Sequence, residues 1–147
     1  MASSLQSFFG FNGRVNRMTF WINGLICFVA TFTLSWMFTT TTTNFATWET
    51  SVHISNKPVY YIAMIIVLWR MASIHVRRWQ DQDKAKEGAV LSMASPILAG
   101  LFPGLAGSWI VIFLGLLALV GWGFMGFVPG DDGDNDYGPP PPEGQCY

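Results

Sequence analysis

The chain has 147 residues, of which 51% are apolar, 16% are aromatic and only 12% are charged. Ordinary soluble domains carry about 25% charged residues, so this composition excludes a typical soluble enzyme domain and indicates one small membrane domain. The formal net charge of −1 provides no basic surface for nucleic acid, and all eight Lys and Arg lie between Arg14 and Lys86.

Residues 1–18 precede the first apolar run and combine three phenylalanines with Arg14 and Arg17. Aromatic rings in the headgroup zone beside cations that face water are typical of an interfacial segment, with a disordered tail as the alternative. Residues 20–38 follow as 19 residues without a charge. As a helix they measure about 28 Å, close to the roughly 30 Å of hydrocarbon, so we predict a first transmembrane helix there.

The next segment, residues 39–58, is polar and rich in threonine. We predict a loop that ends at Pro58, in the first turn of the next helix, because the amide that proline lacks is unpaired at that position anyway. Threonines can also continue a helix in lipid by bonding to their own backbone. The end of the first helix therefore stays open at this point.

A second transmembrane helix is predicted over residues 59–76, and it contains Arg70. A central arginine costs about 2.5–3.5 kcal/mol, which nearly cancels the roughly 0.3–0.6 kcal/mol that each aliphatic residue returns. We therefore expect this helix to insert by packing on its neighbours. Arg70 then faces the bundle interior or extends to the nearer interface.

Residues 88–128 contain no charge over 41 positions, which is too long for one span and suits two. Pro103 and the glycine after it form a turn signal, so we predict helices over 88–102, with Pro96 inside, and 108–128. In a three-span alternative this region holds one span and a re-entrant piece. The predicted fold is an all-α integral membrane protein, a compact four-helix bundle over 19–128.

The basic residues predict the orientation of the bundle. Arg14 and Arg17 flank the first helix, four more lie between the second and third helices, and Lys57 is the only one in the intervening loop. Because loops rich in Lys and Arg stay in the cytoplasm, we expect both termini to be cytoplasmic.

The second helix and its end carry the polar residues that could form a site. Arg70, Arg77 and Asp81 follow one helical stripe, with Arg77 and Asp81 as an i,i+4 pair, while His75 and Arg78 follow another. The cluster suits either a lipid phosphate or another anion, or simple interfacial anchoring. His75 lacks the companions of a metal or haem site, and no catalytic set occurs, so we expect no metal, cofactor or enzyme activity.

The tail, residues 129–147, is acidic and rich in proline. Asp132, Asp134 and Asp136 have the spacing of a calcium loop, but Tyr137 stands where that loop needs glycine. The consecutive prolines favour a polyproline II segment, either a stiff extension or a strip that docks on a partner.

Three motifs occur in the order of a known family. The stretch FNGRVNRMTFW resembles the Phe-x-Gly-Arg-x-x-Arg-x-x-Phe-Trp signature of domain of unknown function 805, a family of small bacterial inner-membrane proteins. RRWQDQDKA is similar to its Arg-Arg-Leu-His-Asp loop, and GDNDYGPPP to its closing Gly-x-Asn-x-Tyr-Gly-Pro-x-Pro. Trp79 and Gln80 replace the usual Leu and His, and Gln80 cannot titrate near neutral pH.

The resemblance implies a multi-pass protein of the bacterial inner membrane and one surface built from the three motifs. It implies that Asp81 pairs with Arg14 or Arg17 and that the tail caps the cluster. The matching positions are Gly13, Arg14, Arg17, Phe20, Trp21, Arg77, Arg78, Asp81, Gly133, Asn135, Tyr137, Gly138 and Pro139.

Two functions fit these features. The first is a non-enzymatic accessory or structural subunit of a larger membrane complex, docking through its aromatic surface and through the tail residues Asn135, Tyr137, Gly138 and Pro139. The second is a membrane protein that binds or moves a phospholipid or another anion. Self-association into a homo-oligomer stays open. The interaction or phosphate cluster common to both is Arg14, Arg17, Arg70, Arg77, Arg78 and Asp81.

Overall fold

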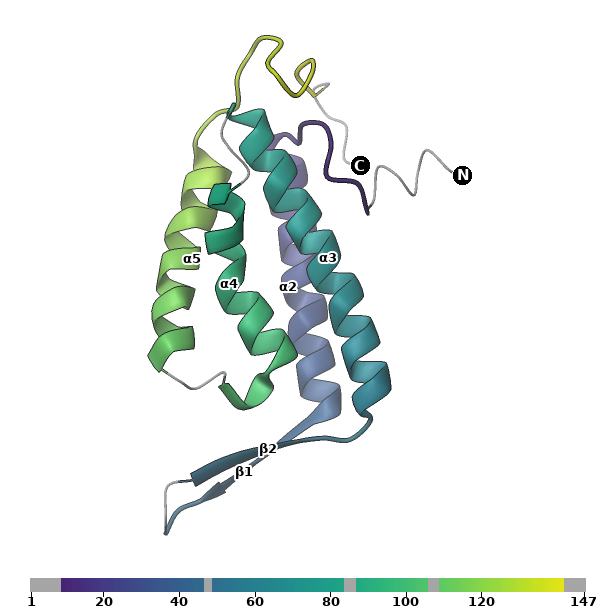
Figure 1. Cartoon of the computed structure of the whole chain (residues 1–147), viewed down its shortest axis with the longest axis vertical. Coiled ribbons are helices and arrows are strands. Elements are labelled where there is room, and N and C mark those ends of the chain that lie inside the picture. Colours follow the sequence, from purple (N-terminus) through teal and green to yellow (C-terminus); the bar gives the residue numbers. More distant parts are fainter. Residues whose placement is uncertain (1–8, 47–48, 84–86, 106–108, 142–147) are drawn as a thin grey trace.

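The computed structural model describes residues 9–46, 49–83, 87–105 and 109–141. These residues form a helical bundle with a small hairpin at one end (Figure 1). The helices alternate in direction along the chain, and residues 9–16 and 128–141 meet at one end, which we call the tail end. The opposite end is the hairpin end. The elements are α2 (Arg17–Phe38), β1 (Thr39–Asn44), β2 (Glu49–Ile54), α3 (Lys57–Asp81), α4 (Glu87–Leu101), η1 (Pro103–Leu105) and α5 (Trp109–Phe127).

Helix α2 begins at Arg17, three residues before the predicted start, because Asn16 caps it. The Asn16 side-chain oxygen accepts a hydrogen bond from the Thr19 amide at 2.8 Å, which satisfies one of the free amides of the first turn. The helix ends at Phe38, where the threonine tract begins.

The prediction of a loop over residues 39–58, within an all-α fold, missed a small sheet. β1 and β2 form an antiparallel hairpin that pairs Thr39 with Ile54 and Asn44 with Glu49. β-Branched threonines fit the pleated backbone of a strand, and the paired strands satisfy one another's amides and carbonyls. The same pairing shows that the threonine tract after α2 forms a strand and does not extend the helix.

Helix α3 begins in the predicted way. Asn56 caps it by accepting from the Val59 amide at 3.4 Å, and Pro58 lies in the first turn, which confirms that prediction. The helix continues to Asp81 without a break. It therefore extends beyond the predicted span of residues 59–76 and brings the Arg77–Asp81 segment into the bundle.

The long uncharged region divides near Pro103, as predicted. α4 has 15 residues with Pro96 inside, η1 forms the turn, and α5 has 19 residues. Within the described ranges, α2, α3 and α5 are long and apolar enough to cross a membrane, whereas α4 counts as a shorter apolar helix. These helices make the chain a multi-pass membrane protein.

Two apolar clusters hold the helices together. Tyr60, at the hairpin end, is fully buried and its hydroxyl donates to the Gly100 carbonyl at 2.7 Å, which ties α3 to α4. The outward surface of the helices is itself apolar, with Trp36 and Trp109 among the most exposed side chains, as expected for a surface in lipid. One cluster contains Val15, Phe20, Cys27, Met71, Ile74, Met93 and Met125, and the other contains Ile54, Tyr60, Met64 and Leu68.

The described part of the N-terminal segment packs on α3. Trp69 donates its indole N–H to the Phe9 carbonyl at 3.1 Å, and the rings of Phe11 and Trp69 meet edge to face at 5.2 Å. The Ser73 hydroxyl donates to the Gly10 carbonyl. These contacts anchor the chain beside α3 and lead Arg14 to the tail end.

Candidate functional site

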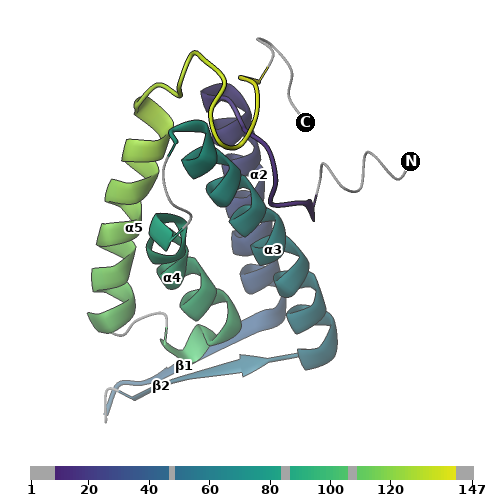
Figure 2. The same cartoon turned by 45° about the horizontal axis from the view of Figure 1, so that its top comes forward.

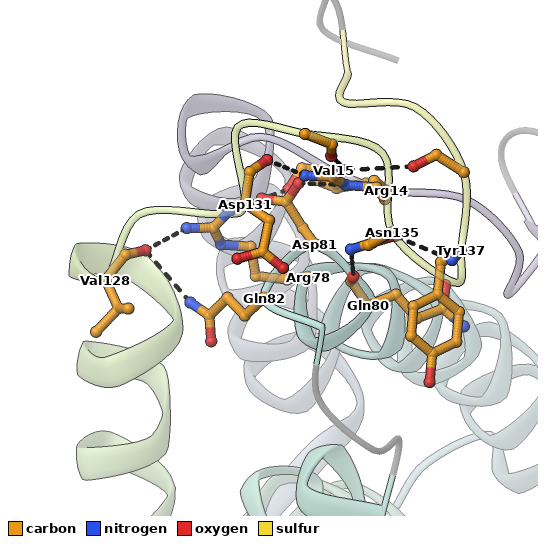
Figure 3. A network of polar contacts seen from close by, with 12 residues as sticks. Arg14, Val15, Arg78, Gln80, Asp81, Gln82, Val128, Asp131, Asn135 and Tyr137 are labelled. Atoms are coloured by element: carbon orange, nitrogen blue, oxygen red, sulfur yellow. Dashed lines mark hydrogen bonds and ion pairs between the residues drawn. The ribbon is translucent and has the colours of Figure 1, made fainter.

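A buried ionic cluster lies at the tail end, centred on Asp81, the last residue of α3 (Figure 3). One carboxylate oxygen accepts from Arg14 Nε at 3.0 Å, and the other pairs with Arg78 Nη1. The exposed fractions are 6% for Arg14, 0% for Arg78 and 3% for Asp81. Two buried cations thus share one carboxylate, so the remaining guanidinium hydrogens need other acceptors.

Carbonyl groups of the tail supply acceptors for Arg14. Its Nη1 donates to the Gly133 carbonyl at 2.6 Å and to the Gly138 carbonyl at 3.2 Å, and its Nη2 donates to the Asp131 carbonyl. Gly138 has φ +114°, a conformation that L side chains rarely adopt. The fixed fork of the guanidinium group can reach several carbonyls at once, which a lysine cannot do.

The second arginine binds the end of α5. Arg78 Nε donates to the Met125 carbonyl at 2.7 Å, and Nη2 donates to the Val128 carbonyl at 2.6 Å. Gln82 donates to the same Val128 oxygen at 3.3 Å, and Arg78 also reaches the Val15 carbonyl. The last carbonyls of a helix have no partners within the helix and favour a cation, so Arg78 caps α5 from the neighbouring helix.

The tail in turn caps α3. The Asp131 amide donates to the Asp81 carbonyl at 2.8 Å, and Asn135 Nδ2 donates to the Gln80 carbonyl at 2.9 Å. Asn135 also accepts from the Tyr137 amide at 2.9 Å, which closes a tight turn (Figure 3). We call Arg14, Arg78, Asp81 and Asn135 the clamp, because together they join the segment before α2, the end of α3 and the tail.

Gly130 is the point at which the tail passes over the clamp. A Cβ atom built at this position would lie 2.1 Å from Asp81 Oδ2 and 2.9 Å from the Asp81 carbonyl oxygen. Since no real side chain tolerates such distances, only glycine lets the backbone approach the carboxylate so closely. The sequence motifs did not include this residue.

The structure brings together some of the predicted site residues and separates others. Arg17 is exposed, and Arg70 is 5% exposed and donates to Asn23 Oδ1 at 2.8 Å, which places it in the bundle interior. Arg77 is also buried, near Gly13. The predicted Arg77–Asp81 pair is wrong, because the two oxygens of Asp81 face Arg14 and Arg78 instead.

His75 is fully buried and has aromatic neighbours. Its Nδ1 lies 2.7 Å from the Met71 carbonyl, and its ring centre is 5.4 Å from that of Phe20 and 5.0 Å from that of Trp122. In the described part of the chain, no three His, Cys, Asp or Glu side chains are grouped to hold a metal ion.

Residues beyond the motifs complete these contacts. Asn23 is the one side-chain amide in the first uncharged run, and its position there could have marked it as the partner of a buried arginine. Gln82 lies one residue beyond α3 and carried no signal. Of the predicted tail residues, Tyr137 and Gly138 are half-buried and Pro139 is exposed, while residues 142–147 lie outside the described ranges.

The helices and the clamp define a small multi-pass membrane protein whose two terminal segments are joined by a buried Arg–Asp cluster. The chain belongs to the family described as protein of unknown function (DUF805), which matches residues 8–139 and confirms the resemblance of the three motifs. Neither a curated protein nor a solved structure matches the chain.

Proposed function

We propose that this protein is a non-enzymatic accessory or structural subunit of a larger protein complex in the bacterial inner membrane. The observation that carries the proposal is the clamp, in which both oxygens of Asp81 are engaged by Arg14 and Arg78. Both oxygens of this carboxylate already accept from buried arginines, so it is poorly placed to take a proton from a substrate. The clamp thus joins segments of the chain to one another, as expected for a rigid scaffold.

Four spans with both termini in the cytoplasm fit this scaffold. The Arg14 side chain, before α2, contacts carbonyls of the tail after α5, so the chain returns to the end from which it started. An even number of crossings gives that result, and α4 runs from near the tail end towards the hairpin end (Figure 1). The tail end also carries most of the basic residues, which favours the cytoplasmic side.

The hydrogen bonds of Arg14 and Arg78 argue against the alternative, which is a lipid or anion site at the same cluster. Arg14 and Arg78 donate hydrogen bonds to Asp81 and to backbone carbonyls, and both side chains are buried. A phosphate would have to displace those acceptors. Among the described residues, Arg17 is an exposed cation at this end, and it lies beside the clamp in a hollow that Asp131 and Asp132 also line.

The outward face provides the surface for a partner in the membrane. Trp109 is 85% exposed on α5, Trp36 is 77% exposed on α2, and a Cβ at Gly123 would meet nothing within 4 Å. Large aromatic side chains and flat glycine patches are the features that allow close helix association in lipid.

Gentle extraction of native membranes tests the proposal. We expect the tagged protein to migrate in a mild detergent at a fixed ratio with a larger membrane complex. Trp109→Ala and Trp36→Ala form a matched pair, since the first removes an exposed indole from α5 and the second removes one from α2. The variant with the smaller co-migrating fraction identifies the helix that contacts the partner. Migration of the wild-type protein at its own mass under every extraction condition would overturn the proposal.

A further inference from the structure

A groove of about 650 Å³ lies between α2, α4, α5 and the hairpin. Both views show α4 between α5 and α3, with the hairpin extending from the end of α2 past the ends of α4 and α5 (Figures 1 and 2). Several of its wall residues are more than half exposed, so the groove opens on the outer face of the bundle. Its principal apolar walls are Phe28, Phe32, Ile112, Leu116, Leu119 and Trp122.

Small residues create this hollow. Ala99 and Gly100 on α4, and Gly115 and Ala118 on α5, line it. Gly115 allows α4 and α5 to pack closely, since a Cβ there would lie 3.3 Å from the Ser95 hydroxyl oxygen.

Three hydroxyl groups in the walls already donate to backbone carbonyls. Thr31 donates to the Cys27 carbonyl at 2.8 Å, Thr39 donates to the Ser35 carbonyl at 2.6 Å, and Ser95 donates to the Val111 carbonyl. Hydroxyls bonded back to the helix backbone present mainly their carbon atoms to the groove. The groove therefore suits an apolar occupant.

Its size favours a flexible chain over a helix. A volume of 650 Å³ falls in the range of about 300–1,000 Å³ typical of small-molecule sites. A helix roughly 10 Å across and about 30 Å long displaces on the order of 2,000 Å³. From Ile112 to Trp122 the α5 wall is about 15 Å long, which is half the hydrocarbon thickness and matches one acyl chain of one leaflet.

A second hollow, of about 390 Å³, adjoins the groove at the hairpin end. Val52 and Pro103 line both hollows, so the two are neighbours. His53 and Lys57 also line the second hollow, and none of the described residues around it is acidic. Lys57 is exposed in the first turn of α3, where the helix dipole adds positive potential.

We propose that the groove and the adjoining hollow form a site for one anionic phospholipid from the leaflet on the hairpin side. One acyl chain lies in the groove between α2 and α5, and the phosphate faces Lys57 and His53. This site is separate from the clamp and lies at the opposite end of the bundle.

Lipid retention by the purified protein tests the acyl-chain half of the proposal. The protein is reconstituted in vesicles of equal phosphatidylglycerol and phosphatidylethanolamine with identical chains, extracted gently, and its bound lipid is counted by native mass spectrometry. We expect one phosphatidylglycerol on the wild type and at least about a tenfold loss in Ala99→Leu, whose larger side chain fills the groove. Ala30→Leu is the matched control, since Ala30 is also half-buried in a helix but does not line the groove.

The charge half is tested by Lys57→Gln against Arg17→Gln. Since one basic residue near a membrane surface contributes about a fivefold preference for an anionic lipid, we expect Lys57→Gln to lower the preference for phosphatidylglycerol about fivefold. Arg17→Gln, an exposed cation at the opposite end, should leave that preference unchanged. Thermal unfolding in detergent verifies that all four variants remain folded.

Three results would overturn the proposal. The first is a wild type that retains no lipid, and the second is retention that Ala99→Leu leaves intact. The third is a preference for phosphatidylglycerol that Arg17→Gln removes and Lys57→Gln does not, because it would place the headgroup at the tail end. None of these results depends on whether the protein is a subunit of a larger complex.

Discussion

At the scale of single residues, the clamp brings two arginines and one aspartate out of water. Removing charges from water costs several kcal/mol per ion, and the cost is offset only when the remaining hydrogen-bond groups are satisfied. Arg14 and Arg78 meet that condition with backbone carbonyls of the tail and of α5. The ion pairs and the tail conformation therefore depend on one another.

Asp81→Asn tests this dependence. The substitution keeps the shape of the side chain but leaves two buried cations without a counter-charge, which we expect to lower the free energy of unfolding by about 3–5 kcal/mol. The unfolding temperature in detergent, followed by tryptophan fluorescence, should fall clearly.

Asp83→Asn is the matched control for this change. Asp83 is exposed and has φ 49°, a conformation that asparagine also adopts readily. Its unfolding temperature should stay near that of the wild type. Equal stability of the two variants would mean that the carboxylate of Asp81 contributes nothing to the fold.

At the scale of elements, α2 and α5 approach each other most closely at Gly126, near the tail end. A Cβ at Gly126 would lie 2.2 Å from the Trp21 ring, and Trp21 donates its indole N–H to the Gly126 carbonyl at 3.2 Å. Towards the hairpin end the two helices diverge around the groove. The contact of Trp21 with Gly126 thus holds the helices at one end while the other stays open.

Gly126→Ala should force the Trp21 ring away and destabilise the protein. Overpacking of this kind typically costs about 1–3 kcal/mol. Gly123→Ala is the control on the same helix, since its Cβ meets nothing within 4 Å, and its better helix propensity adds up to about 1 kcal/mol. Unfolding temperatures in detergent should rank Gly123→Ala at or above the wild type and Gly126→Ala below it; the reverse order would contradict the close contact.

At the scale of the whole molecule, the clamp joins the beginning and the end of the bundle. The segment before α2 and the tail after α5 share Arg14, while the hairpin and η1 lie at the opposite end (Figure 1). Because of this arrangement, labelling one position at each end of the bundle distinguishes four crossings from three.

Thr43→Cys and Asp132→Cys, each in a Cys146→Ser background, should label from opposite sides of the membrane. Both positions are exposed, and the remaining cysteine, Cys27, is buried. With four spans, an impermeant thiol reagent added outside the cell modifies Thr43→Cys at once and Asp132→Cys only after the membrane is opened. Labelling of both from the same side would indicate three spans.

Sequence reasoning located the helices well but placed their ends less accurately. Uncharged runs and Pro103 predicted where α2, α4 and α5 lie, because transfer into lipid is set by each segment's own composition. It missed the hairpin, because threonine suits a loop, a strand or a helix in lipid, and the choice depends on pairing between residues that are five to fifteen positions apart.

The sequence by itself determined the class of the protein, its apolar helices and, through the three motifs, its family. The resemblance of the motifs also implied that Asp81 pairs with Arg14 or Arg17 and that the tail caps the cluster. Only the tertiary structure decided which partners those are. Asp81 pairs with Arg78 rather than with Arg77, and the tail passes closely over Asp81 at Gly130. The sequence could not predict these contacts, because backbone carbonyls, which every residue carries, supply most of the acceptors and leave no mark in the sequence.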